Sequence, residues 1–228
     1  MIGPLDSTAS ERWSRSARRL GIASATGILA VGILYVAVIT LWLIIEATPR
    51  EPIGDPYLAV MEILTMVSAL ALLGLVIAIW CFADAARRVQ ALGALSIGSL
   101  AAVLTMAIHF VQLTAVRQLW RAGRVSDYRL VWPSPLFAVE YFVWDILVGL
   151  TMVSAGFALA GGPAAVHARR ALLIGGVLCL VGTAGPLSGR MLVQNVAVLG
   201  YTVVFPLAGA FMAGVFRAAL PSSGAAAA

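Results

Sequence analysis

Six long apolar runs are the feature that most limits how this chain can fold. They lie at about 20–45, 57–83, 91–116, 134–160, 170–187 and 191–216. At about 1.5 Å per helical residue, each is long enough to cross roughly 30 Å of membrane hydrocarbon, and the fifth is the shortest. Lipid offers no hydrogen-bond partners to the backbone, so runs of this kind fold as helices. The sequence therefore predicts an all-α, polytopic membrane protein with a six-helix transmembrane bundle over 20–218.

The composition excludes an ordinary soluble domain. Hydrophobic residues make up 61% of the chain and charged residues 11%, and the mean hydropathy is +0.99. A soluble domain has about 25% charged residues. So much apolar surface cannot be hidden in one soluble core, and lipid is the partner that the composition predicts. The sequence is also compatible with a homo-oligomer.

The basic residues predict the orientation of the bundle. All fifteen are arginines, and they stand at the edges of the apolar runs. With the N-terminus in the cytoplasm, nine face the cytoplasm and six the other side, which agrees with the positive-inside rule. Both termini are therefore predicted to be cytoplasmic, with a basic tail at 1–19 and a disordered low-complexity tail at 219–228. The absence of lysine and the abundance of alanine and arginine indicate a GC-rich bacterium, and hence the inner membrane.

The positions of the arginines, cysteines and histidines disfavour several other functions. The arginines form no basic patch interleaved with aromatic residues, so we expect no nucleic-acid partner. Cys81 and Cys179 lie in apolar runs with no second ligand at metal spacing, and we expect no metal or cofactor. Haem is disfavoured because the second histidine, His167, is predicted in a cytoplasmic loop. The connection 117–133, rich in Arg and Trp, is predicted to lie along the outer interface.

Polar residues recur at one depth in the bundle. Glu62, His109 and Glu140 lie about five to seven residues from the outer ends of their runs, and Asp145 lies deeper, at about ten. Gln194 and Asn195 lie near the outer end of the sixth run. Ionisable side chains inside a membrane are costly and usually functional. Polar groups from four helices at a shared depth predict a common pocket in the outer half.

Helical phase divides these residues between faces. His109 and Gln112 share a face of the third helix, while on the sixth Gln194 lies with Tyr201, and Asn195 on the next face. Pro206 should perturb the sixth helix, because it cannot donate to the carbonyl four residues earlier.

Glu140 and Asp145 should point in different directions. At about 100° per residue they lie roughly 140° apart, so Glu140 is assigned to the pocket. Asp145 shares a face with Gly149, which suits close packing, and is assigned to an inter-helix hydrogen bond. The reverse assignment stays open.

The residue types suggest acid–base chemistry on a lipophilic substrate, such as an isoprenoid or sterol. A carboxylic acid in apolar surroundings can serve as a general acid, and nearby aromatic faces can stabilise positive charge. The catalytic candidates are Glu140, Asp145 and His109, and the ligand-binding candidates are Glu62, Gln112, Tyr141, Trp144, Gln194, Asn195 and Tyr201. Two alternatives stay open: a proton-coupled transporter of a small solute, and an assembly subunit whose buried polar groups only fix helix packing.

Overall fold

The computed structural model describes residues 12–45, 53–124, 132–160 and 162–220, and these residues form helices joined by short connections. Six helices are long and apolar enough to cross a membrane, which indicates a multi-pass membrane protein. Within the described ranges there is no strand. The six spans are Arg15–Ile45, Tyr57–Phe82, Ala85–Arg121, Pro135–Ala158, Ala165–Ser188 and Met191–Ala218.

Some spans are built from several consecutive segments. The first two spans are single helices, α2 (Arg15–Ile45) and α3 (Tyr57–Phe82). The third contains η1 (Ala85–Arg87), α4 (Arg88–Val111), η2 (Gln112–Val116) and α5 (Arg117–Arg121). The fourth contains α6 (Pro135–Tyr141), η3 (Phe142–Val148) and α7 (Gly149–Ala158). The remaining segments are α8 (Pro163–Gly182), α9 (Ala184–Ser188), α10 (Met191–Leu199), η4 (Gly200–Val204) and α11 (Phe205–Ala218).

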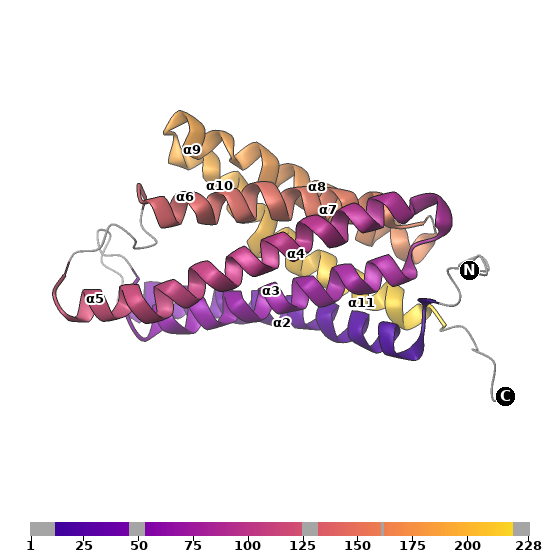
Figure 1. Ribbon diagram of the computed structural model, residues 1–228, viewed down its shortest axis with the longest axis horizontal. Coiled ribbons are helices and arrows are strands. Elements are labelled where there is room, and N and C mark those ends of the chain that lie inside the picture. Colours follow the sequence, from indigo (N-terminus) through magenta and orange to yellow (C-terminus); the bar gives the residue numbers. More distant parts are fainter. Residues whose placement is uncertain (1–11, 46–52, 125–131, 161, 221–228) are drawn as a thin grey trace.

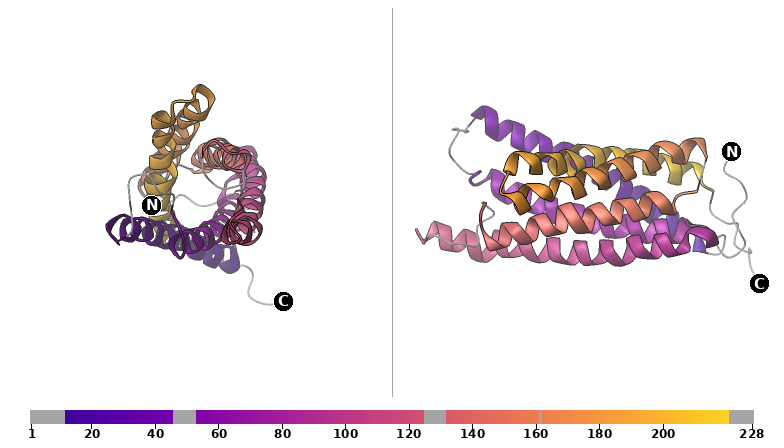
Figure 2. Two further views of the ribbon diagram at one scale, coloured as in Figure 1. Left: turned by 90° about the vertical axis from the view of Figure 1, so that its left-hand side faces the viewer. Right: turned by 90° about the horizontal axis from the view of Figure 1, so that it is seen from above.

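The spans pack as a ring in chain order. Each long helix contacts the next one along the chain, and α11 returns to pack against α2. Figure 2 (left) looks along the bundle and shows this closed arrangement. The start of α2 and the end of α11 lie together, because Arg18 donates hydrogen bonds to the carbonyls of Phe216 (3.0 Å) and Arg217 (2.7 Å). We call this the terminal end of the bundle; Figure 1 shows it on the right, with α5 and α9 on the left.

Aromatic residues fill the core at the terminal end. The ring centroids of Trp13, Phe82 and Phe216 lie 5.1 to 5.8 Å from one another. The Arg12 guanidinium lies 5.0 Å from the Trp80 ring centroid and donates to the carbonyls of Trp80 and Ala83. Such a cluster excludes water, so the core at the terminal end is closely packed around these side chains.

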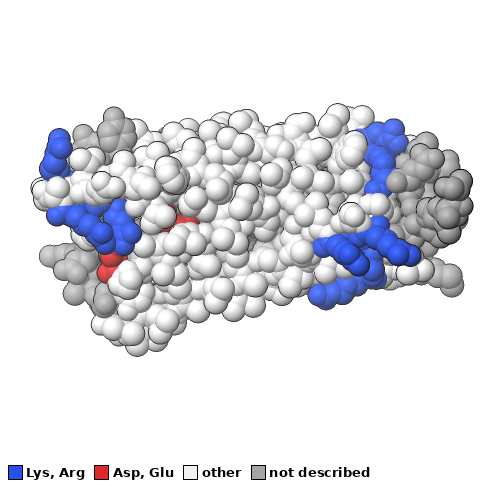
Figure 3. All heavy atoms as spheres, turned by 60° about the horizontal axis from the view of Figure 1, so that its bottom comes forward, with Lys and Arg blue, Asp and Glu red and all other residues white. Residues whose placement is uncertain are grey.

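Charge is segregated along the bundle as a membrane requires. On the face shown in Figure 3, arginines lie at the two ends and uncharged residues fill most of the band between them. Leu, Ile, Val and Phe side chains stand exposed on most of the long helices. An exposed apolar band between two charged ends matches the lipid-facing surface of a membrane protein.

Several spans extend beyond their apolar runs; the first begins at Arg15 and the third at Ala85, where the predicted runs began at 20 and 91. The fifth begins with α8 at Pro163, earlier than the predicted 170, so His167 and Arg169 lie on a helix and not in a loop. Arg169 lies 5.9 Å from the Phe157 ring centroid, which shows how a helix can carry arginine at its edge. The third span likewise continues to Arg121, so 117–121 does not turn along the interface as predicted (Figure 1). The tails were predicted at 1–19 and 219–228, and α2 already begins at Arg15, so part of the predicted basic tail is helix. Residues 1–11 and 221–228 of these tails, and 125–131 of the predicted interface segment, lie outside the described residues.

The end opposite the terminal end is tied by an ion-pair cluster that the sequence analysis did not anticipate. One carboxylate oxygen of Asp55 accepts hydrogen bonds from Arg117 (2.7 Å) and Arg121 (3.1 Å). Asp55 stands just before α3, and both arginines belong to α5. The spacing of four residues puts the two guanidinium groups on one face of α5, so they converge on one acid. We call this end of the bundle the Asp55 end.

Candidate functional site

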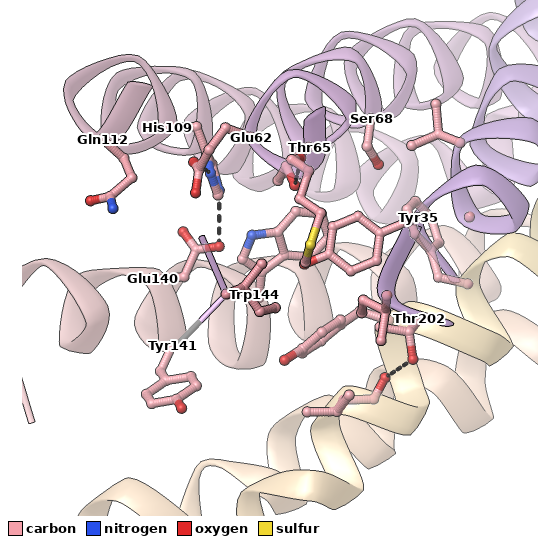
Figure 4. A pocket seen from close by; sticks show the side chains of 18 of the residues that line it. Tyr35, Glu62, Thr65, Ser68, His109, Gln112, Glu140, Tyr141, Trp144 and Thr202 are labelled. Atoms are coloured by element: carbon pink, nitrogen blue, oxygen red, sulfur yellow. Dashed lines mark hydrogen bonds and ion pairs between the residues drawn. The ribbon is translucent and has the colours of Figure 1, made fainter. Parts of the chain in front are cut away.

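A cavity of about 500 Å³ lies between the helices in the half of the bundle nearer the Asp55 end. Five of the six spans contribute to its walls, the exception being the fifth. The walls are mostly apolar and aromatic, and a few polar side chains are gathered on one side (Figure 4). A largely apolar cavity with a few convergent polar groups is the usual form of a small-molecule site.

Three ionisable side chains from three helices meet at the cavity wall. His109 on α4 contacts Glu62 on α3 through Nδ1, and Glu140 on α6 through Nε2, the latter at 2.9 Å. Glu62 and His109 are 4% exposed, and the Glu140 side chain is 13% exposed. Figure 4 shows the imidazole standing between the two carboxyl groups. We call these residues the Glu–His–Glu cluster.

The two contacts of this cluster require two hydrogens. Each ring nitrogen faces a carboxyl oxygen, so each contact needs one hydrogen. The two hydrogens can both be on an imidazolium between two carboxylates, or one can move to a carboxyl group. In either arrangement one negative charge is in excess. The cluster can thus pass a proton between Glu62 and Glu140 without changing its total charge.

Three polar atoms of the cavity walls face no partner within the described chain. These are Oε2 of Glu140, Oε1 of Gln112 and the indole nitrogen of Trp144, all buried. Leaving a buried polar atom unsatisfied costs about 1–3 kcal/mol, which makes such atoms natural contacts for a ligand or water. Two of the three are acceptors when Glu140 is ionised, so these unsatisfied atoms include more acceptors than donors.

Irregular helix turns position several of these side chains. The π-helical segments η2, η3 and η4 supply Gln112, Trp144, Tyr201 and Thr202 to the cavity. In a π-helix the hydrogen bonds span five residues instead of four, which widens the turn and shifts which side chains face inward. η4 stands directly before Phe205 and Pro206, where the sequence predicted a perturbed helix. The Thr202 hydroxyl donates to the carbonyl of Val198 at 2.5 Å, which supports the altered turn.

Glu140 and Asp145 face different surroundings, as expected from the assignment of Glu140 to the pocket and of Asp145 to packing between helices. Glu140 lines the cavity, whereas Asp145 does not and is 0% exposed. The angle of roughly 140° does not apply, because η3 interrupts the regular helix between them. Gln194 interacts with the Asp145 carboxyl, but no side chain of the described residues reaches either oxygen at hydrogen-bonding geometry. The inter-helix hydrogen bond expected for Asp145 stays a prediction, with Gln194 of the sixth span as the residue that could form it.

The face that Asp145 shares with Gly149 packs closely on α8, as the sequence suggested. A Cβ atom added to Gly149 would lie 3.1 Å from the Cβ of Cys179 and from the carbonyl of Gly176. Gly156, two turns on, approaches Leu173 in the same way. Small residues let these two helices approach, which favours association in lipid where no hydrophobic effect drives it.

The sixth span presents Gln194 and not Asn195 to the interior. Gln194 is 3% exposed, lines the cavity and donates to the Tyr201 hydroxyl at 3.2 Å. Asn195 is exposed and does not line the cavity, so its assignment as a pocket residue is corrected. The reason is the angle between successive residues of a helix. Gln194 faces Gly185 in the preceding helix, so Asn195, the next residue, points toward the outside of the bundle.

Eight of the ten candidates from the sequence line the cavity. They are Glu62, His109, Gln112, Glu140, Tyr141, Trp144, Gln194 and Tyr201.

Sequence reasoning missed the contribution of the first span. Tyr35 and Gly32 line the cavity from α2, and Thr65 and Ser68 extend it from α3 (Figure 4). Tyr35 lies about ten residues from the end of α2, so its depth matched that of the other polar groups and could have revealed it. A tyrosine near a helix end is commonly an anchor at the membrane interface, so the depth of Tyr35 was not taken as a sign that it lines the cavity.

The cluster is not arranged as a metal site. Its two carboxylates contact opposite nitrogens of the imidazole, so the three side chains do not converge on one point. Across 12–45, 53–124, 132–160 and 162–220, no group of three His, Cys, Asp or Glu residues could hold a metal ion. The chain matches no known protein family, and no curated protein or solved structure is significantly similar to it.

Proposed function

We propose that this protein binds a small lipophilic molecule in the cavity and exchanges a proton with it through Glu140. The observation that carries this proposal is the Glu–His–Glu cluster, whose Glu140 Oε2 is free of partners in the described structure and reaches the cavity wall. A carboxyl group tied to a histidine can be reprotonated after it gives up its proton. The apolar walls suit an isoprenoid or sterol-like skeleton.

In the proposed reaction, each residue of the cluster has a separate role. Glu140 gives its proton to the ligand or takes one from it. When Glu140 gives up its proton, His109 supplies another through Nε2 and takes one from Glu62 through Nδ1; the reverse relay restores Glu62 when Glu140 takes a proton back from the ligand. The surrounding apolar walls keep water away from a bound ligand, and between ligands the cluster exchanges hydrogen with solvent through Glu140, whose side chain is 13% exposed.

A proton-coupled transporter is less well supported. The described acidic and histidine residues that are buried, Glu62, His109 and Asp145, all lie in the half nearer the Asp55 end. Toward the terminal end the buried polar side chains are Ser and Thr, and the aromatic cluster around Trp13 follows. A proton pathway across the membrane would need titratable or hydrated groups along its whole length.

The arginine distribution supports the proposed location and orientation. Of the arginines that the structure describes, nine flank the terminal end and four the Asp55 end, which favours cytoplasmic termini in a bacterial inner membrane. The cavity would then open in the outer half of the membrane. A reporter enzyme that is active only outside the cytoplasm, fused after Ala228, should be inactive; activity would reverse the orientation.

Deuterium transfer tests the proposed chemistry. The purified protein is incubated in D₂O with a total lipid extract of its native membranes, and the products are analysed by mass spectrometry. We expect deuterium to enter one lipid class. Glu140→Gln should slow this by about 100-fold or more, because an amide cannot deliver the proton.

The control is a second carboxylate-to-amide change, at Asp84, which lies between α3 and η1 at the terminal end of the bundle. Asp84→Asn disrupts a pair with Arg87 (2.5 Å) at the terminal end and should leave deuterium transfer unchanged. Deuterium transfer by Glu140→Gln at the wild-type rate would overturn the proposal, and so would the absence of any labelled compound with the wild-type protein.

A further inference from the structure

We propose that the ligand of this cavity carries an ammonium group on its apolar skeleton. This inference rests on the proposed binding function and names the class of ligand. It draws on three features of the cavity walls: the excess negative charge of the Glu–His–Glu cluster, the unsatisfied acceptors, and the number of aromatic rings.

The charge balance favours a cation. The cluster keeps one negative charge in excess when both of its hydrogen bonds are formed. No arginine is among the described residues that line the cavity, and the chain has no lysine. An uncompensated charge in low-dielectric surroundings is costly, and a cationic ligand would remove that cost. An anionic lipid headgroup would instead add a second negative charge.

The unsatisfied atoms favour a donor of more than one hydrogen bond. Glu140 Oε2 and Gln112 Oε1 are acceptors for which the described residues supply no donor. Both lie on the side of the cavity where His109 stands (Figure 4). A primary or secondary ammonium group has at least two N–H donors, and its hydrogen bond to a carboxylate is of the stronger, charge-assisted kind.

The aromatic walls favour the same ligand. Tyr35, Tyr141, Trp144 and Tyr201 all line the cavity. The rings of Trp144 and Tyr201 pack with their centroids 5.4 Å apart and tilted by 52°, which gives a continuous aromatic surface. Aromatic faces attract cations, most strongly where water is excluded.

Three probes with one skeleton test this inference. 4-Phenylbutylammonium, 4-phenylbutanol and 4-phenylbutyrate share a phenylalkyl skeleton and carry a cationic, a neutral and an anionic polar group, and each fits a cavity of about 500 Å³. Binding to the purified protein is measured by calorimetry at neutral pH. We expect the ammonium to bind at least about tenfold more tightly than the alcohol, and the carboxylate to bind most weakly. Equal binding of ammonium and alcohol would overturn the inference.

A variant locates the binding within the protein. Glu140→Gln should remove about tenfold of the affinity for the ammonium and little of that for the alcohol. Asp84→Asn should alter neither. If the ammonium preference of Glu140→Gln equals that of the wild type, the cavity is not its source and the inference fails. The ammonium preference without deuterium transfer would refute the proposed reaction alone, and deuterium transfer without that preference would refute this inference alone.

Discussion

His109→Leu is expected to lower the free energy of unfolding by about 3 kcal/mol, because it leaves two buried carboxyl groups facing an apolar side chain. Glu62 is 4% exposed and has His109 as its hydrogen-bond partner. Without the imidazole, each acid must take up a proton or remain as an unpaired charge, and both outcomes disfavour the folded state. Unfolding in mixed micelles, followed by far-ultraviolet circular dichroism, measures the change.

A triple variant separates the loss of pairing from the loss of packing. Replacing Glu62, His109 and Glu140 all with Leu removes the charges together with the imidazole. Apolar replacement of a whole buried ionic cluster is often close to neutral, so we expect the triple variant to recover more than half of the stability that His109→Leu loses. If the triple variant is as unstable as the single one, packing around the imidazole and not unpaired charge is what stabilises this region.

Much of the fold could be predicted from the sequence because its dominant constraint is simple. Apolar runs long enough to cross lipid must be helical, and six of them were recognised by length and composition alone. The helix ends were harder to place. Arg117, Arg121 and Arg169 ended the apolar runs but not the helices, because a helix can carry arginine where its side chain reaches polar surroundings.

The depth of the polar residues in the membrane predicted the candidate site better than their angular positions around each helix did. Shared depth brought Glu62, His109 and Glu140 into one group, and the structure joins them through the two nitrogens of the imidazole. Angular positions counted at the ideal helical period did not exclude Asn195 from the pocket, whereas the structure places this residue on the exposed surface. The period also changes at η2, η3 and η4, where the backbone departs from regular helix beside the cavity. Such departures depend on packing between helices, which no count along one helix can supply.

Close packing of the helices depends on glycines, which have no functional group, and not on the residues of the candidate site. Gly182→Ala tests this dependence by adding one methyl group. Its Cβ would lie 2.3 Å from the Cβ of Ala197 and 2.6 Å from its backbone nitrogen, so α8 and α10 would have to separate. We expect the free energy of unfolding to fall by about 3 kcal/mol, the upper part of the range for overpacking. Gly214→Ala is the matched control on α11, where no atom of the described residues lies within 4 Å of the added Cβ. It should keep or slightly raise stability, since alanine favours helix. Equal stability of the two variants in mixed-micelle unfolding would contradict a close contact between these helices.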